Sequence, residues 1–392
     1  MRSRPKYTIT AREVHQRTAA ILQKHVQFVD QGTKCTAWAL ITILLYAASR
    51  ITSLLDACRR LLGAPTDQAV REALRATLPP INELQRRLNA GLTAELPKSL
   101  FKRSWPVALD LTLIPYHGKP HQDSREIYRS RAKSGTTHFH AYATAYVVRK
   151  GARFTVALTR VLYDDTIKEV VQRLLQQLRR IGVKVRYLLL DREFYSVEVV
   201  RYLQSARIPF LMPVAQRGRR STGAKKSQGI RRFFTWKRSG WSQHRWRNPQ
   251  GRSATVGICV VYGRFGKRKK PRRPRRFVYA YWGFHPPSCR WVRETYRKRF
   301  SIETTYRQMN QARIRTSTRD PLLRLLFVGL ALILCNVWVW FHLMCLAVGR
   351  LDRRQLRLER LRFREMLLWL QHYAEQMFGF HDSTPAQHPM PP

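Results

Sequence analysis

The sequence predicts an α/β protein in which a sheet with covering helices is interrupted by a basic, β-rich insertion. Residues 106–118, 137–150 and 153–163 have the alternating apolar pattern and turn residues of strands. Residues 166–214 then have the patterns of a helix, an apolar strand, a second helix and a further strand. The predicted order is therefore three strands, helix, strand, helix, strand.

The two ends of the chain have helical patterns. Helical spacing covers most of residues 1–100, with Pro79-Pro80 as a break. Basic helical sequence and a proline-rich tail make up residues 351–392. We therefore expect a helical N-terminal region at residues 1–100, and a basic C-terminal helix and tail at residues 351–392.

A basic stretch without acids forms the predicted insertion. No Asp or Glu occurs from residue 199 to residue 293, where aromatic residues are interleaved with Lys and Arg. Short β-like runs predict a small inserted sheet at residues 215–285. Its most cationic run includes Lys269 and Arg272, which we expect to follow a phosphate backbone.

The charge of the chain indicates a polyanionic partner. There are 73 Lys and Arg against 24 Asp and Glu, which gives a formal net charge of +49. Because neutralised phosphates release counterions, such a surplus favours binding to nucleic acid. We expect the helical N-terminal region at residues 1–100 to bind DNA. An anionic membrane surface is the second candidate partner.

The cysteines and the N-terminal sequence predict an intracellular, reduced protein. The six cysteines are scattered without a CxxC pair, which argues against a zinc ribbon and a disulfide scaffold. The polar N-terminal sequence lacks the apolar core of a signal peptide.

One segment raises the question of a membrane. Residues 325–349 carry no formal charge and are long enough to span a bilayer. Basic residues flank both sides, so charge assigns no orientation. A helix that is apolar all round is either buried or membrane-spanning. We favour the buried core helix and expect no membrane partner.

Two aspartates occupy positions that are typical of ligand sites. Asp110 interrupts an apolar strand, where an unpaired carboxylate is unfavourable, although backbone amides at a strand edge could satisfy it. Asp191 directly follows the apolar run "YLLL", and α/β folds place ligands beyond the carboxyl ends of strands. An N-cap for the next helix is the alternative role of Asp191.

The stretch "YRKRFSIETTYRQMN" predicts a polar stripe on one helix. Tyr296, Arg299, Glu303 and Asn310 fall at steps of three, four and seven residues, which places them on one face. An ion pair between Arg299 and Glu303 is the structural alternative for two of them. It leaves Tyr296 and Asn310 unexplained.

Taken together, the three acids predict a metal site. A central first strand beside the fourth strand would bring Asp110 next to Asp191, and the later helix could add Glu303. Clustered carboxylates favour divalent ions, here Mg²⁺ or Mn²⁺. Two such ions about 3.5–4 Å apart can support cleavage of a phosphodiester.

These motifs carry a resemblance to a known family. The order of Asp110 in "LDLTLIPYHG", Asp191 in "LLLDREFYS" and Glu303 in its helix resembles the DDE transposases of prokaryotic insertion sequences. The last motif is similar to the branch with a Tyr-x2-Arg-x3-Glu-x6-Lys signature. The resemblance implies a ribonuclease H-like catalytic core, with its two parts at residues 101–214 and 286–350.

The resemblance also implies an activity and partners. The protein would be a cut-and-paste transposase in which Asp110, Asp191 and Glu303 hold Mg²⁺ or Mn²⁺. Tyr296 and Arg299 would lie near the cleaved terminal phosphate. Partners would be double-stranded DNA at terminal inverted repeats, target DNA and a second copy in a homodimer. The setting would be the prokaryotic cytoplasm, in association with the nucleoid.

Two details of DNA contact stay open. The lysine position of the signature is Asn310, so its DNA contact passes to Arg307 or Arg313, or is absent. Some relatives stack a flipped base on a tryptophan of the insertion. Three tryptophans are candidates by position, and the core of the small sheet is their alternative place: Trp236, Trp241 and Trp246.

Other functions are compatible with parts of this pattern. An element-derived DNA-binding protein without cleavage would keep the positive charge, although the intact acids argue against it. A purely hydrolytic, metal-dependent nuclease would use the same metal site. A membrane-associated basic protein would depend on residues 325–349.

Overall fold

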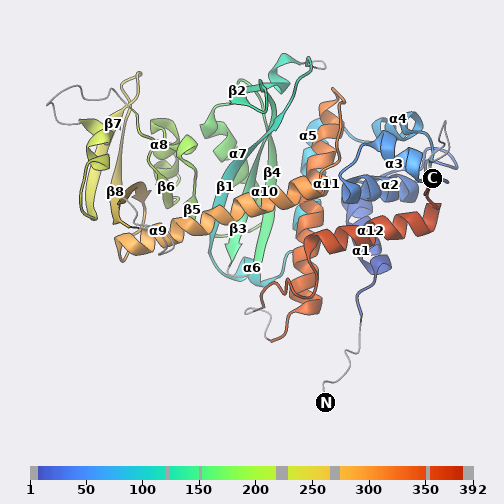
Figure 1. Ribbon diagram of the computed structural model, residues 1–392. Helices are drawn as coiled ribbons and strands as arrows, with labels where there is room; N and C mark the ends of the chain where they lie inside the picture. The colour runs from blue at the N-terminus through green and yellow to red at the C-terminus, as the bar shows by residue number, and fades with distance from the viewer. Residues whose placement is uncertain are drawn as a thin grey trace, which may run out of the picture.

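The computed structural model describes most of the chain, and for residues 300–305 it describes the backbone alone. The described residues are 8–120, 123–149, 152–217, 228–264, 274–349 and 354–382. They form a nine-stranded sheet with helices on both faces, and further helices lie beyond one edge (Figure 1).

The sheet is mixed, and its centre has the predicted order. The strands run β2-β3-β1-β5-β6-β9-β8-β7, and β4 also pairs with β3. Strand β1 is antiparallel to β3 and parallel to β5, which is parallel to β6. The bounds are β1 Trp105–Pro115, β2 Tyr128–Lys133, β3 Thr136–Arg149, β4 Ala152–Val161, β5 Val185–Leu189, β6 Phe210–Pro213, β7 Gly240–Arg247, β8 Ser253–Gly263 and β9 Arg275–Trp282.

The N-terminal sequence forms helices before the first strand, as its helical spacing predicts. The break at Pro79-Pro80 separates α4 from α5, as the double proline predicts. The bounds are α1 Ala11–His25, α2 Ala37–Arg50, α3 Leu54–Arg60, α4 Asp67–Thr77, α5 Ile81–Thr93 and α6 Ser99–Lys102.

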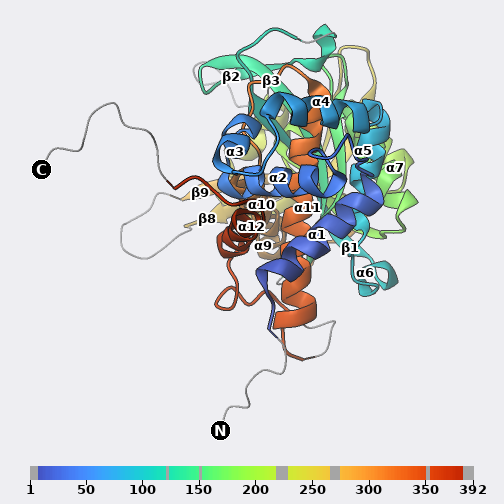
Figure 2. The ribbon, with the colours of Figure 1, turned by 90° about the vertical axis from the view of Figure 1, so that its right-hand side faces the viewer.

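Two groups of helices cover opposite faces of the sheet. Helices α7 (Ile167–Arg180) and α8 (Val197–Ser205) lie on one face, and α9 (Cys289–Arg297) and α10 (Ser301–Gln311) lie on the other (Figures 1 and 2). Successive strand residues point to alternate faces.

In β1 this alternation sets the direction of Asp110. Val107 and Leu109 join the core under α7 and α8, whereas Ala108 joins the cluster under α9. Asp110 is in phase with Ala108 and therefore faces the α9 and α10 side.

The inserted strands do not form a separate small sheet, so that prediction is wrong. Strand β9 pairs antiparallel with β6, from Phe210 opposite Trp282 to Pro213 opposite Tyr279, and β8 and β7 follow. Without β9, β6 would be an edge strand with unpaired backbone groups. Extending the core sheet satisfies those groups.

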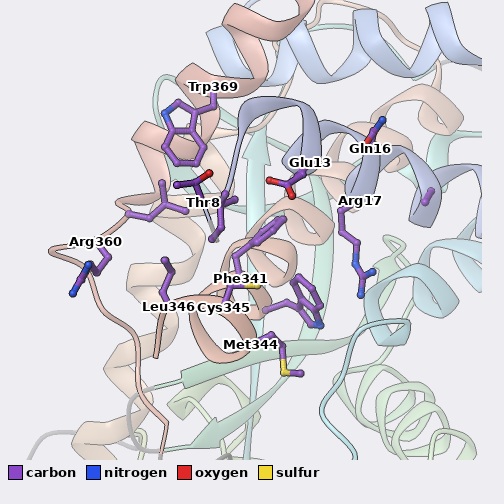
Figure 3. A pocket seen from close by; sticks show the side chains of 14 residues that line it. Thr8, Glu13, Gln16, Arg17, Phe341, Met344, Cys345, Leu346, Arg360 and Trp369 are labelled. Carbon is purple, nitrogen blue, oxygen red and sulfur yellow. The ribbon is translucent and has the colours of Figure 1, made fainter. Parts of the chain in front are cut away.

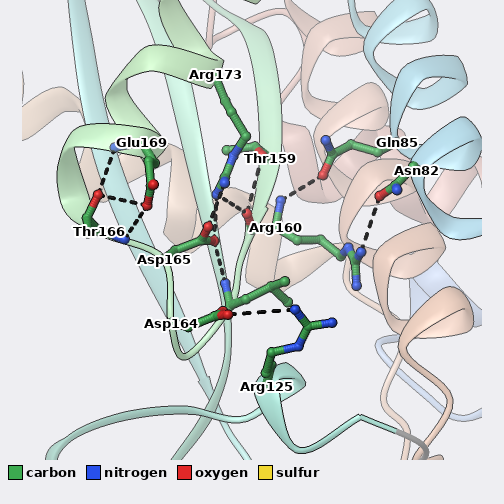
Figure 4. A network of polar contacts seen from close by, with 11 residues as sticks. Asn82, Gln85, Arg125, Thr159, Arg160, Asp164, Asp165, Thr166, Glu169 and Arg173 are labelled. Atoms are coloured by element: carbon green, nitrogen blue, oxygen red, sulfur yellow. Dashed lines mark hydrogen bonds and ion pairs between the residues drawn. The ribbon is translucent and has the colours of Figure 1, made fainter.

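The outer edge of β4 is closed by side-chain amides instead of another strand. Asn336 accepts from the Thr155 amide (3.0 Å) and donates to the Thr155 carbonyl (2.7 Å). Asn89 makes the same pair of bonds with Leu158, at 2.7 and 2.8 Å. Gln85 accepts from the amide of Arg160 at 2.8 Å (Figure 4). These bonds fix α5 and α11 to the sheet.

Helix α11 (Pro321–Phe341) is a core helix. The span Pro321–Leu346 is long and apolar enough to cross a membrane, yet 94% of its most apolar window is buried in the protein. The helix stands between the sheet and the N-terminal helices (Figure 2). The last helix, α12 (Phe363–Phe378), packs against α1 and α2.

Candidate active site

The structure brings Asp110 and Asp191 together at the centre of the sheet. In the parallel pair of β1 and β5, Ala108 lies opposite Leu189. Each aspartate is two residues further along its strand direction, so the two occupy equivalent positions on neighbouring chains. The Asp110 side chain is 16% exposed, and the Asp191 side chain, at the mouth of the site, is 34% exposed.

Arg299 lies between the two carboxylates. Its Nη2 donates to Asp110 Oδ1 at 2.8 Å, and its Nη1 lies 3.8 Å from Asp191 Oδ1. The Arg299 side chain is only 7% exposed. It comes from the 3₁₀ turn Lys298–Phe300 that joins α9 to α10. This turn therefore delivers a cation to both acids.

Backbone amides donate to the same oxygen of each acid that Arg299 approaches. The amide of Leu111 donates to Asp110 Oδ1 at 3.0 Å, and the amide of Arg192 donates to Asp191 Oδ1 at 2.7 Å. Asp191 caps the 3₁₀ turn Arg192–Phe194, so its predicted alternative role as a cap is realised, although for that turn and not for α8. Capping and ligand binding are compatible because a carboxylate has two oxygens.

Tyr306 is part of the site and was not predicted. Its hydroxyl donates to the Asp110 carbonyl at 3.2 Å and lies 2.7 Å from Thr144 Oγ1. These bonds tie α10 to β1 and β3 beside the catalytic candidate. The available signal was its position on α10, one turn after Glu303.

Burial dominates the electrostatics of Asp110. Burial raises the pKa of Asp110 to about 6, with further raising by Asp191 and Glu193, against the lowering effect of Arg299. The pKa of Arg299 is raised, because its aromatic and acidic neighbours outweigh burial. The single guanidinium therefore compensates the two acids only in part.

Tyr296 is buried beneath this pair. It is 4% exposed and its ring centroid lies 5.3 Å from that of Tyr279, while Arg299 approaches its ring at 6.0 Å. Burial raises the pKa of the Tyr296 hydroxyl. Contact of Tyr296 with a cleaved DNA end stays a prediction.

The predicted polar stripe on one continuous helix is wrong. The 3₁₀ turn Lys298–Phe300 interrupts the α-helical period between Tyr296 and Asn310. Asn310 is exposed and accepts from Arg313 Nε at 3.4 Å. Arg307 is exposed as well, and Arg313 is half-buried. Their DNA contacts stay predictions.

The third predicted acid lies on the right element, but its side chain is outside the described residues. Glu303 is on α10, in the first turn after the 3₁₀ turn that carries Arg299. Lys269 and Arg272 also lie outside the described residues.

The tryptophans of the insertion differ in their surroundings. Trp236 packs edge-on against Phe233, and Trp246 stacks on Tyr195 with ring centroids 4.8 Å apart. Trp241 is 41% exposed and meets Tyr281 only edge-on. Trp236 and Trp246 thus agree with the core alternative more closely than Trp241 does.

The cavity beside Trp246 is strongly cationic. It has a volume of about 640 Å³ and lies between α8 and β7. Its arginines are Arg217, Arg231, Arg245 and Arg247.

A larger cavity lies elsewhere and contains none of the predicted site residues. It measures about 1020 Å³ and opens between α1, the end of α11 and α12 (Figure 3). Apolar side chains such as Trp340, Phe341 and Trp369 line it, with Arg17 and Glu13 beside them.

The donor set suits a hard divalent cation, although the structure does not show a complete site. Among the described side chains, no group of three or more His, Cys, Asp or Glu residues could hold a metal ion. Asp110 and Asp191 supply carboxylate oxygens, which Mg²⁺ and Mn²⁺ prefer. The buried Nε of Arg299 has no hydrogen-bond partner among the described residues. The present counterion is therefore imperfectly matched to the site.

Comparisons with known proteins identify the family and a similar fold. Residues 102–336 match the family model described as "Transposase DDE domain". The fold is similar to a piggyBac transposase in a synaptic complex with hairpin DNA, solved by cryo-EM, with a TM-score of 0.55 and 9% identity. That match covers 94% of this chain and 78% of the other chain. No curated protein matches the chain.

Proposed function

The chain belongs to the transposase DDE domain family, and from this premise we propose that it nicks and joins insertion-sequence ends by a cut-and-paste route. The observation that carries the proposal is the pairing of Asp110 with Asp191 on adjacent parallel strands. The strand order β4-β3-β1-β5-β6, with α7 and α8 between its last strands, supports a ribonuclease H-like core. In this proposal, the insertion separates the core from its Glu303 helix.

Asp110, Asp191 and Glu303 would hold the catalytic cation, Mg²⁺ or Mn²⁺. Bound there, it would polarise phosphate oxygens and ease deprotonation of an attacking water or 3′-hydroxyl. The chain itself supplies position: Tyr306 fixes the β1 backbone at Asp110, and the Arg192 amide orients Asp191. Such support keeps the carboxylates in place before DNA arrives.

Binding of DNA would come from the positive charge of the chain. The substrates would be double-stranded DNA at the terminal inverted repeats and a target duplex, bridged by a homodimer. Arg299, Arg307, Arg313 and Trp241 are our candidates for contact near the cleaved end. Guanidinium groups suit this place because their planar fork grips phosphate with two bonds. We expect the protein to act in the prokaryotic cytoplasm, at the nucleoid.

Metal dependence gives the first test of the proposal. The full-length protein is incubated with a labelled duplex of its own element's end, with Mg²⁺, with Mn²⁺ or with EDTA. We expect nicking at the element end and joining to a target duplex with either metal, and neither with EDTA. A scrambled end of the same length should be bound but not cut at a defined position.

The same gel separates the alternatives. Cleavage at the end without any joined product would identify a hydrolytic nuclease. A DNA complex without cleavage under all metal conditions would identify a DNA-binding protein that does not cut. Either outcome would contradict the proposal.

A further inference from the structure

Arg299 lies between Asp110 and Asp191, where a metal cation bound by both acids would have to lie. It approaches Asp110 at 2.8 Å and Asp191 at 3.8 Å, and its side chain is almost completely enclosed. Its contacts with the two acids come from Nη1 and Nη2, the two ends of one guanidinium. A group that bridges both acids in this way takes up the space between them.

The contact of Arg299 with the two acids lacks part of the geometry of a permanent buried ion pair. The distance from Arg299 Nη1 to Asp191 is too long for a hydrogen bond, so of the two acids Arg299 is hydrogen-bonded to Asp110 alone. A permanent buried pair would be expected to use both ends of the guanidinium fork at hydrogen-bond distance. The Arg173–Asp165 pair shows such a geometry, with both Nη atoms 2.6 Å from carboxylate oxygens (Figure 4).

We propose that Arg299 is a built-in counterion, which holds Asp110 and Asp191 together in the metal-free protein and is displaced when a divalent cation binds them. This inference rests on the proposed metal site. Metal and guanidinium then compete for the same carboxylate oxygens, so each weakens the binding of the other. The displaced side chain becomes available to a DNA phosphate beside the same acids.

Direct metal binding tests the inference without any measurement of activity. Mn²⁺ alone is titrated into the full-length protein, and bound ion is followed by calorimetry and by the electron paramagnetic resonance of free Mn²⁺. Removing the competing cation in Arg299→Gln should lower the Kd for Mn²⁺ by about tenfold, a size typical of coupled sites. Arg299→Lys, which keeps the charge without the fork, should lie between Arg299→Gln and the wild type.

Thermal unfolding gives a second readout and a matched control. Without metal, Arg299→Gln should unfold at a lower temperature than the wild type because Asp110 loses its counterion. Saturating Mn²⁺ should reduce this difference in unfolding temperature between Arg299→Gln and the wild type. Arg173→Gln breaks a pair whose acid is similarly enclosed, since Asp165 is 11% exposed, while Arg173 itself is 37% exposed. Its loss of stability should not respond to Mn²⁺.

A third variant separates failure of the inference from failure of the proposed function. Asp110→Asn should abolish Mn²⁺ binding whether or not Arg299 is present. If it does, and Arg299→Gln binds Mn²⁺ no more tightly than the wild type, Arg299 is not a competitor and the inference fails alone. If Mn²⁺ binds equally well to Asp110→Asn and to the wild type, the metal site and the inference built on it both fail.

Discussion

Asp110→Asn is expected to reduce cleavage of element-end DNA by about a thousandfold or more, because a lost metal ligand removes several kcal/mol of transition-state stabilisation. The Asp110 side chain is more enclosed than that of Asp191, and Asp110 lies on strand β1, in the interior of the sheet. Asn keeps the size of the side chain but lacks the charge that a divalent cation needs. Affinity for the DNA duplex should change little, since the net positive charge of the chain supplies it.

Asp165→Asn is the matched control for this change. The Asp165 side chain is similarly enclosed and paired with an arginine, but Asp165 lies just before the N-cap of α7 and not on the strands that carry the paired aspartates. It should lose stability while retaining cleavage per folded molecule. Full cleavage by Asp110→Asn under the same conditions would remove Asp110 from the catalytic centre.

Asn336→Leu is expected to lower the free energy of unfolding by about 3 kcal/mol. The substitution leaves three backbone groups without partners: the amide and carbonyl of Thr155 and the carbonyl of Leu92. Each buried group without a hydrogen bond costs about 1–3 kcal/mol. Chemical denaturation followed by circular dichroism would measure the change.

The control for that substitution lies on the neighbouring helix. Asn82 is exposed on α5, where it accepts a long bond of 3.4 Å from Arg160 (Figure 4). Asn82→Leu should change stability by no more than about 0.5 kcal/mol. A similarly small effect of Asn336→Leu would show that the edge of β4 does not depend on this amide.

The strands that carry the acids could be predicted because their signals are local. Alternation identifies β1, β3 and β4, and the apolar run before Asp191 identifies β5. Once β1 and β5 are neighbours, the spacing of each aspartate from its strand places the two side by side. The predicted pairing of Asp110 with Asp191 thus needed only strand order and phase.

Other features depend on contacts that no local pattern records. The exposed strand β2 has the polar sequence "YRSRAK", and pairing with β3 makes it a strand. Strand β7 was likewise missed, since β8 supplies its pairing. The bonds of Asn89 and Asn336 to β4 join residues far apart in sequence.

The segment that was expected to form one helix around Glu303 shows both a feature that the sequence predicts and one that it does not. The expected helix begins as α9, with Ser288 as its N-cap after Pro286-Pro287, but the 3₁₀ turn Lys298–Phe300 separates α9 from α10, which carries Glu303. The break turns Arg299 toward the two aspartates. The family resemblance implied that Arg299 lies near the cleaved terminal phosphate, and the contact of Arg299 with Asp110 was not foreseen.

The central claim is that Glu303 completes a metal centre with Asp110 and Asp191. The measurement that tests it most directly compares the wild type with Glu303→Gln on the element's own end DNA in Mg²⁺. The account predicts cleavage at the end by the wild type alone, with unchanged DNA binding by Glu303→Gln. Equal cleavage by both proteins would contradict it and return Glu303 to the role of a helix ion-pair residue.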